Sequence, residues 1–190
     1  MKFRIFRRAG FFCFLLFSLP FTTHQAEARP VRDHLTAQEA DMVREAQELD
    51  KRTAVFIKAA ERRLVAINDP NSAKQISKAD AEKWGELKGT RADFMFDLSK
   101  ILDEAITNID DVSSRDERNP LVPKSIRKLS EAATRILAQL APLRDTVADG
   151  KERAFYEQAV ENAQQIVEAA GSLPPPPPAK SDKKKKGETR

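Results

Sequence analysis

The chain contains one cysteine and two histidines, and both scarcities limit what it can do. Cys13 and His24 lie in an N-terminal segment that has the features of a removable export signal. The mature chain therefore has no thiol for a disulfide or a cysteine metal site. His34 is its only histidine, and we interpret it as exposed and structurally idle. The stability of this chain must come from a packed core.

Residues 1–28 are predicted to be a signal peptide that is cleaved after Ala28. They combine a basic start, an apolar run from Phe11 to Phe21 and the small-x-small sequence Ala26-Glu27-Ala28. The apolar run is short for a hydrocarbon core about 30 Å thick, which disfavours the alternative of an uncleaved membrane anchor. We expect a protein that is exported and is periplasmic or extracellular.

Six glycines and a single mature histidine leave little material for an active site. The sequence contains no Gly-rich phosphate loop, no G-x-S-x-G and no H-E-x-x-H, and no Glu-x-x-His motif for a di-iron site. We therefore predict a non-enzymatic protein without a cofactor or a small-molecule substrate. An enzyme or metal carrier that uses only carboxylates is the weakest alternative. Its candidate calcium ligands cluster around one loop, where arginines interleave them and favour a solvated, salt-bridged loop instead: Asp110, Asp111, Asp116 and Glu117.

Four amphipathic patterns predict four helices, and no strand pattern occurs. Apolar residues recur three and four apart over 36–68, 79–113, 126–147 and about 151–170. Thr36 with Glu39 is typical of a capping box, and Thr90 with Asp93 offers a later start for the second helix, near Gly89. Residues 113–123 are predicted to be a loop, and Pro142 is expected to kink the third helix.

These patterns favour an all-α domain over residues 29–173, built as an elongated antiparallel four-helix bundle with coiled-coil-like packing. Two helices are expected to be long and two shorter. The spacing near 3.5 residues also makes self-association through leftover apolar surface plausible. Substituting Leu98 or Leu140 with alanine is expected to destabilise this core.

One helix carries candidate partner residues outside its main apolar stripe. Trp84 and Phe94 fall on the stripe and are interpreted as core. Met95 and Phe96 fall beside it, which indicates either a wide buried face or a partner-binding patch. Arg91 interrupts the stripe, and it is expected either to extend its guanidinium to solvent or to pair with an acid across the bundle.

Residues 174–190 form a tail of five prolines followed by a lysine run, for which no packed structure is expected. The tail has a net charge of +4 and the domain one of −3. This distribution is not that of a specific nucleic-acid-binding domain. The candidate polyanion-binding residues, which would contact an anionic membrane surface or an envelope polymer, are Lys180, Lys183, Lys184, Lys185 and Lys186. The alternative is a solubilising terminus without a partner.

The five residues Leu35-Thr36-Ala37-Gln38-Glu39 resemble the Leu-Thr-x-x-Gln motif of Spy-like periplasmic chaperones, with Glu39 where that family has glutamine. The resemblance implies a small, all-helical exported protein that binds unfolded clients. We predict an envelope-associated binding, scaffold or adaptor protein with a protein partner. A Spy-like chaperone is the alternative.

Overall fold

The computed structural model describes residues 32–69, 78–147 and 150–175, and these residues form helices and no strand. The N-terminal 31 residues and the tail lysines lie outside the described residues. The elements are α1 (Ala37–Glu45), α2 (Leu49–Asn68), α4 (Lys78–Trp84), α5 (Arg91–Arg115), α6 (Leu121–Leu140), the 3₁₀ turn η1 (Ala141–Leu143) and α7 (Lys151–Gly171). The predicted all-α fold is confirmed.

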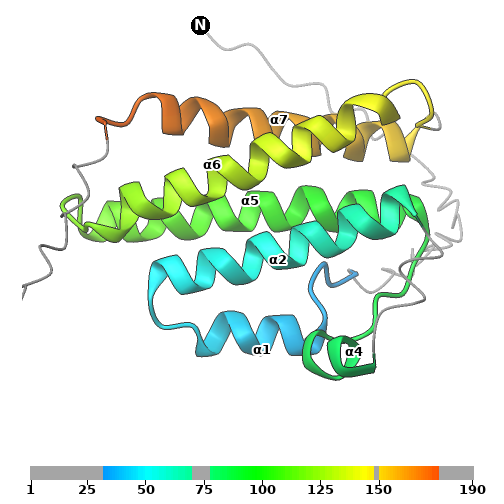
Figure 1. The fold of residues 1–190 in the computed structure, drawn as a ribbon, viewed down its shortest axis with the longest axis horizontal. Helices are drawn as coiled ribbons and strands as arrows, with labels where there is room; N and C mark the ends of the chain where they lie inside the picture. Colours follow the sequence, from blue (N-terminus) through cyan, green and yellow to red (C-terminus); the bar gives the residue numbers. More distant parts are fainter. Residues whose placement is uncertain (1–31, 70–77, 148–149, 176–190) are drawn as a thin grey trace, which may run out of the picture. The chain divides into compact units, whose positions relative to one another are not determined.

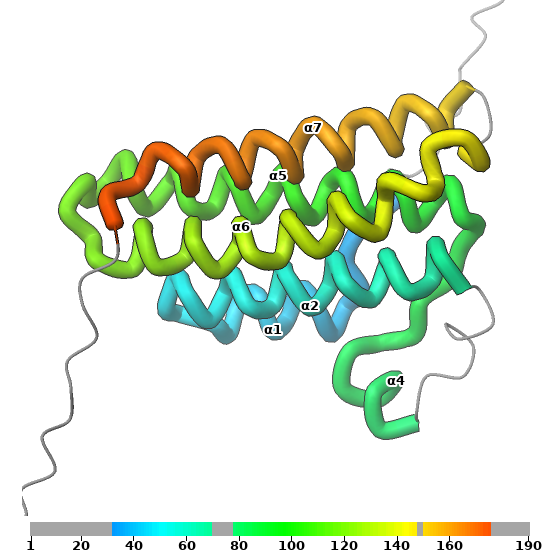
Figure 2. The backbone as a smooth tube through the Cα atoms, turned by 45° about the horizontal axis from the view of Figure 1, so that its top comes forward, coloured from blue at the N-terminus to red at the C-terminus, as the bar shows by residue number. Residues whose placement is uncertain are grey.

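Helices α2, α5, α6 and α7 pack against one another in a bundle (Figure 1). Helix α5 contacts α2 and α7, and α6 contacts the same two helices, whereas α5 and α6 barely touch. The chain directions in Figures 1 and 2 make α2/α5 and α6/α7 antiparallel pairs, and α2/α6 and α5/α7 parallel ones. The predicted antiparallel arrangement therefore describes two of these pairs. These four helices have 20 to 25 residues, so the expected division into two long and two shorter helices does not hold for them.

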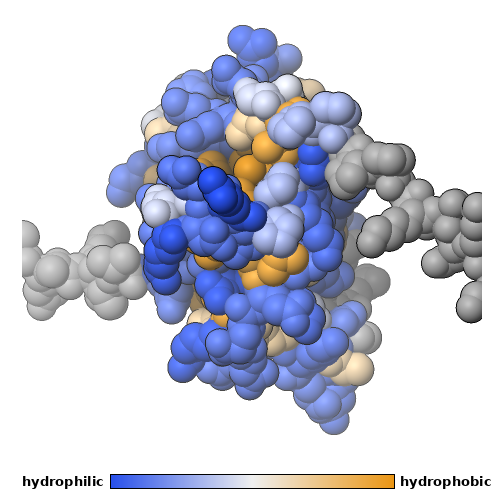
Figure 3. Space-filling model, turned by 90° about the vertical axis from the view of Figure 1, so that its left-hand side faces the viewer, coloured by the Kyte–Doolittle hydropathy of each residue, from blue (hydrophilic) through white to orange (hydrophobic). Residues whose placement is uncertain are grey.

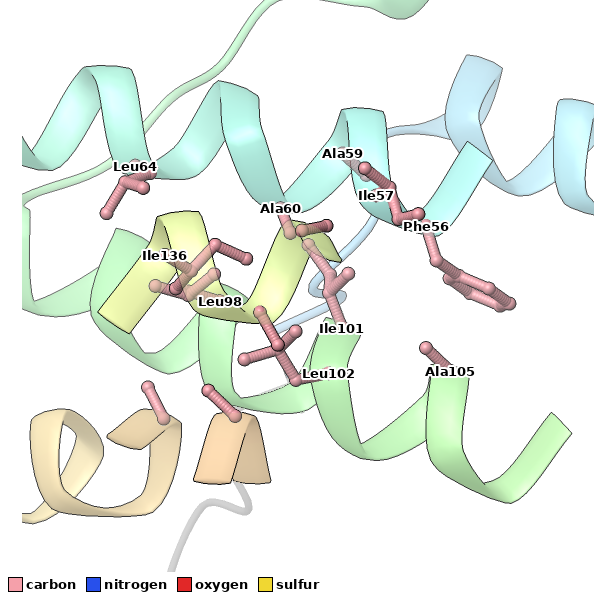
Figure 4. Packing of buried hydrophobic residues seen from close by; sticks show 14 of the residues in the cluster. Phe56, Ile57, Ala59, Ala60, Leu64, Leu98, Ile101, Leu102, Ala105 and Ile136 are labelled. Carbon is pink, nitrogen blue, oxygen red and sulfur yellow. The ribbon is translucent and has the colours of Figure 1, made fainter. Parts of the chain in front are cut away.

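The core of the bundle is mostly aliphatic, with Phe56, Phe94 and Tyr156 among its members, and it lies where the four helices face one another (Figure 4). Leu98, Ile101 and Leu140 are completely buried, as the periodicity predicted. Alanines of α2, α6 and α7 are buried beside them, and such small side chains let neighbouring helices approach closely. This packed interior fixes the positions of the side chains on the outer faces of the four helices.

The helix predicted over 36–68 is two helices, because the chain leaves α1 at Ala46 and begins α2 at Leu49. Helix α1 packs on α2, so the chain must reverse between them. The Arg52 side chain closes this turn by donating to the Ala46 carbonyl at 3.0 Å. The predicted capping box of Thr36 and Glu39 is present at the start of α1. Periodicity missed the break because both helices are amphipathic.

The helix predicted over 79–113 is also divided. Helix α4 ends at Trp84, and the two glycines that follow adopt positive φ angles, 76° at Gly85 and 152° at Gly89. A Cβ atom on Gly85 would lie 2.6 Å from the side-chain oxygen of Gln38. Helix α5 then begins with the Thr90–Asp93 capping box, which confirms the later start that the sequence offered.

The connections around α6 also differ from the prediction. The loop expected over 113–123 is shorter, since α5 continues to Arg115 and α6 begins at Leu121. Pro123 lies in the first turn of α6, where its missing N–H removes no intrahelical bond. At the other end α6 stops at Leu140, and Pro142 belongs to the 3₁₀ turn η1 instead of a kink within a longer helix. The last helix, α7, lies as expected.

Candidate functional site

Met95 does not belong to a partner-binding patch, because it is completely buried. Phe96, the neighbouring candidate, is half-buried and packs edge-to-face on Phe155 of α7, with ring centroids 5.1 Å apart. Helix α5 contacts both α2 and α7, so it must bury two faces and not one. The wide buried face is therefore the correct interpretation of these two side chains.

Arg91 pairs with an acid across the bundle, which was one of its two predicted roles. Its Nε lies 3.4 Å from Glu152 Oε1 at the start of α7. Its guanidinium also donates to the carbonyl and the hydroxyl of Thr146, at 3.2 and 3.1 Å. Arg91 thus connects the beginning of α5 to the start of α7 and to the segment before it.

Trp84 was predicted to belong to the core, but it is half-buried at the end of α4.

A buried ionic cluster joins α1 to the bundle, and its centre is the carboxylate of Glu39. This residue is completely buried, and it accepts hydrogen bonds from Arg62 and from Arg63, the latter at 2.5 Å. Arg62 also donates to the carbonyl groups of Trp84 and Gly85. Through these bonds, one side chain of α1 is connected to α2 and to the segment that follows α4.

A second carboxylate, Asp97 of α5, extends the cluster. Arg32 donates to both of its oxygens, at 3.0 and 2.9 Å, and Arg63 Nε lies 3.8 Å from Oδ2. Burial nevertheless raises the pKa of Asp97, because desolvation outweighs the attraction of the two arginines. Burial likewise lowers the pKa of Arg62. The cluster therefore combines favourable pairing with a real desolvation cost.

His34 is not idle, contrary to the prediction. Its Nε2 lies 2.6 Å from Glu104 Oε2 of α5, and its carbonyl oxygen accepts from Arg63 at 2.7 Å. An open polar cleft of ≈ 410 Å³ lies beside this region, lined by residues that include Arg32, Gln38, Lys88 and Asp97. Three basic and three acidic residues line this cleft, so its net charge favours neither an anion nor a cation. We interpret the cluster as the attachment of α1.

The sequence contained a signal for this cluster that periodicity did not use. Arg62 and Arg63 are adjacent and interrupt the most apolar part of α2, between Ala60 and Leu64. Two arginines cannot be buried there without acidic partners. Glu39 was interpreted only as half of a capping box, a role that it also has. In the structure, the segment that resembles the Spy-like motif serves to attach α1 to α2.

The strongest candidate for a binding site is an apolar groove at the end of the bundle where α5 ends and α6 begins. It has a volume of ≈ 100 Å³ and is lined by Ile106, Ile109 and Asp110 of α5, Ile126 and Leu129 of α6, and Gln165, Ile166 and Ala169 of α7. It lies between the two bundle helices that hardly touch, α5 and α6. Figure 3 shows apolar side chains among the polar surface at this end of the bundle.

Some residues of the groove were predicted to belong to the core, and others were given no role from the sequence. Ile126 and Leu129 were predicted to be core, and Leu129 is buried while Ile126 is half-exposed. The apolar periodicity could not reveal the groove, because the same apolar residues would be covered if α5 and α6 packed directly against each other. Among the described residues, Val65 is the only exposed large hydrophobic residue, with 47% of its surface accessible.

The acidic loop that was considered as a calcium site shows local pairing. Asp111 accepts from Arg115 at 3.1 Å, and Asp116 accepts from the Arg118 amide at 3.2 Å. Within residues 32–69, 78–147 and 150–175, no three metal-ligating side chains gather in one place. The first bond is an ion pair within α5, and the second is a bond to the backbone in the turn that follows this helix.

In the part of the chain that the structure describes, no helix has the length and apolarity needed to cross a membrane. No protein family, curated protein or solved structure matches this chain.

Proposed function

We propose that the mature chain is an exported, non-enzymatic binding protein of the cell envelope, a scaffold or adaptor that captures an apolar side chain of a protein partner. The observation that supports this proposal is the groove between α5, α6 and α7. Concave apolar sites with a few polar groups at the rim are the usual places where proteins bind ligands. The predicted signal peptide and the scarcity of catalytic residue types in the sequence agree with this proposal.

The dimensions of the groove define the occupant. A cavity of about 150 Å³ holds a benzene molecule, so ≈ 100 Å³ suits one branched aliphatic side chain. The walls are isoleucine, leucine and alanine, while Asp110 and Gln165 supply the polar groups. A leucine or isoleucine with a basic residue beside it would fill the groove and pair with Asp110. The proposed partner is therefore a peptide segment with an aliphatic anchor and a neighbouring lysine or arginine.

The groove can be tested by filling it. The immobilised mature chain would be used to select binders from a random peptide library, and their affinities measured by fluorescence anisotropy. Ala169→Trp places a large side chain at the groove, and Ala138→Trp is the matched control at an exposed position of α6 outside it. We expect selected peptides to contain an aliphatic anchor and to lose at least tenfold in affinity for Ala169→Trp alone. Equal affinities for both variants would contradict the proposal.

A Spy-like chaperone would use the same apolar surface, so an aggregation assay separates the two functions. The mature chain would be added in stoichiometric amounts to a model client that is unfolding. As a binding protein with a one-residue anchor site, it should leave the aggregation rate unchanged. Suppression that Ala169→Trp abolishes and Ala138→Trp retains would favour the chaperone instead.

The same preparations test the non-enzymatic assignment and self-association. The temperature of thermal unfolding should not change with added Ca²⁺ or EDTA, and a clear shift would favour the carboxylate-based alternative.

For self-association, sedimentation equilibrium at several concentrations is the direct measurement. The coiled-coil-like packing predicted from the spacing would favour a dimer, and Ala169→Trp would weaken a dimer that uses the groove.

A further inference from the structure

The four bundle helices divide into a basic pair and an acidic pair. Helix α2 carries five basic and two acidic side chains, and helix α6 carries four basic side chains and one acidic side chain. Helix α5 carries three basic and six acidic side chains, and α7 two and four. Since α2 packs beside α6 and α5 beside α7, like charges gather on the same side of the bundle. Arg62 and Arg63 are buried against Glu39, so α6 supplies most of the exposed excess.

In the two ion pairs that join α2 to α6, the acid lies deeper than the base, while Glu131 of α6 is exposed. Lys124 of α6 is 62% exposed, while its partner Asp50 of α2 is 15% exposed, and their separation is 2.5 Å. Arg135 is 57% exposed and its partner Glu61 39%, at 3.0 Å. A surface that approaches from solvent therefore meets the cations first. The hydrogen bond from Lys124 also lowers the pKa of Asp50, so this pair stays charged.

The basic side is hollowed at one end, and the tail begins there. An open hollow of ≈ 790 Å³ is lined by Lys124, Arg127 and Lys128, with Pro120 and Pro123 and the acids Asp50 and Glu131. Arg127 donates to the carbonyl oxygen of Pro174, the first residue of the tail.

We propose that the α2/α6 side is a docking surface for anionic phospholipids, with the hollow receiving headgroup phosphates. This surface is distinct from the groove between α5, α6 and α7, and the proposal does not depend on the groove's function. Lys124, Lys128 and Arg135 are four and seven residues apart, which places them along one side of α6. Such a row suits an extended anionic surface, and each cation near it strengthens binding about fivefold.

The test must separate this surface from the tail. The mature chain would carry glutamine in place of Lys183, Lys184, Lys185 and Lys186, and binding would be measured by cosedimentation with vesicles of phosphatidylglycerol and phosphatidylcholine. The surface variant is Lys58→Gln/Lys128→Gln, two exposed cations of α2 and α6. Lys100→Gln/Lys151→Gln changes the net charge equally on α5 and α7, and it is the matched control. Circular dichroism verifies that each variant is folded.

We expect the tail-neutralised chain to bind these vesicles in a salt-sensitive manner and not to bind pure phosphatidylcholine. The surface variant should bind between about 5- and 25-fold more weakly, and the control should bind as the parent does. No binding by the parent, or equal weakening of both variants, would overturn the proposal. Binding to soluble heparin at the same salt concentration, without binding to vesicles, would assign the surface to a polymer and also overturn it.

Discussion

The bundle interior and the attachment of α1 are both buried, yet opposite chemistry holds them together. Between α2, α5, α6 and α7 most buried side chains are aliphatic, as at Leu98 and Leu140. Glu39 is the buried residue of α1, and it pairs with the buried arginines Arg62 and Arg63 of α2. Aliphatic packing tolerates small shifts, whereas a buried ion pair is favourable only while every partner is in place. The bundle is thus the stable scaffold, and α1 is a segment whose position depends on a few groups.

The largest effect is expected from breaking the ionic region. Glu39→Ala leaves Arg62 and Arg63 without their shared carboxylate and should cost about 3–5 kcal/mol in the free energy of unfolding, measured by urea denaturation. The triple variant Glu39→Leu/Arg62→Met/Arg63→Met removes the charges together and should regain most of that loss. If the triple variant were as unstable as Glu39→Ala, stranded charge would not be the cause.

Truncation in the aliphatic region should cost slightly less and behave additively. Leu98→Ala and Leu140→Ala each remove a completely buried side chain, and about 2–5 kcal/mol is expected for each. Val65→Ala is the control, since an exposed position should change stability by no more than about 0.5 kcal/mol. A loss at Val65 comparable to that at Leu98 would show that the helices are packed differently.

The two capping boxes allow the regions to be compared with the same chemistry. Thr90→Ala removes the cap of α5 and should cost about 1 kcal/mol. Thr36→Ala removes the cap of α1 and also the hydrogen bond that Thr36 donates to the Trp84 carbonyl of another segment at 2.6 Å, whereas the Thr90 hydroxyl donates within its own cap, to Asp93 at 2.9 Å. The free energy of unfolding should therefore fall further for Thr36→Ala. Equal losses would mean that this second bond adds nothing.

The smallest effect concerns pH. Hydrogen bonds from the Thr90 amide and hydroxyl hold the pKa of Asp93 below its usual value of 3.8, so the contribution of Asp93 to stability is complete above that pH and is lost as the pH falls. For Asp97 the sign is opposite, because its raised pKa gives a contribution that is present in acid and is lost as the pH rises. Asp93→Asn should therefore reduce the rise of the free energy of unfolding with pH in the acid range, and Asp97→Asn should make that rise steeper. Urea midpoints over this range measure both slopes.

Local signals predicted the helices and their starts more accurately than their connections. The Thr36 and Thr90 caps could be read directly because a capping box involves residues only three apart. The break before Leu49 could not be predicted in this way, because it is stabilised by the packing of α1 on α2, which involves residues far apart in the sequence. Met95 was ambiguous for a related reason, since one periodic pattern cannot indicate how many neighbours a helix will contact.

The amino-acid sequence alone determined that the described chain is helical, which residues form the aliphatic core and where two helices begin, because these properties depend on side chains a few positions apart. Tertiary structure decided which helices are neighbours. That choice left the groove between α5 and α6, placed α2 beside α6 as a basic pair and buried Glu39 between two arginines. Each of these features joins residues from different helices, and the free energy that selects them arises only when the helices pack.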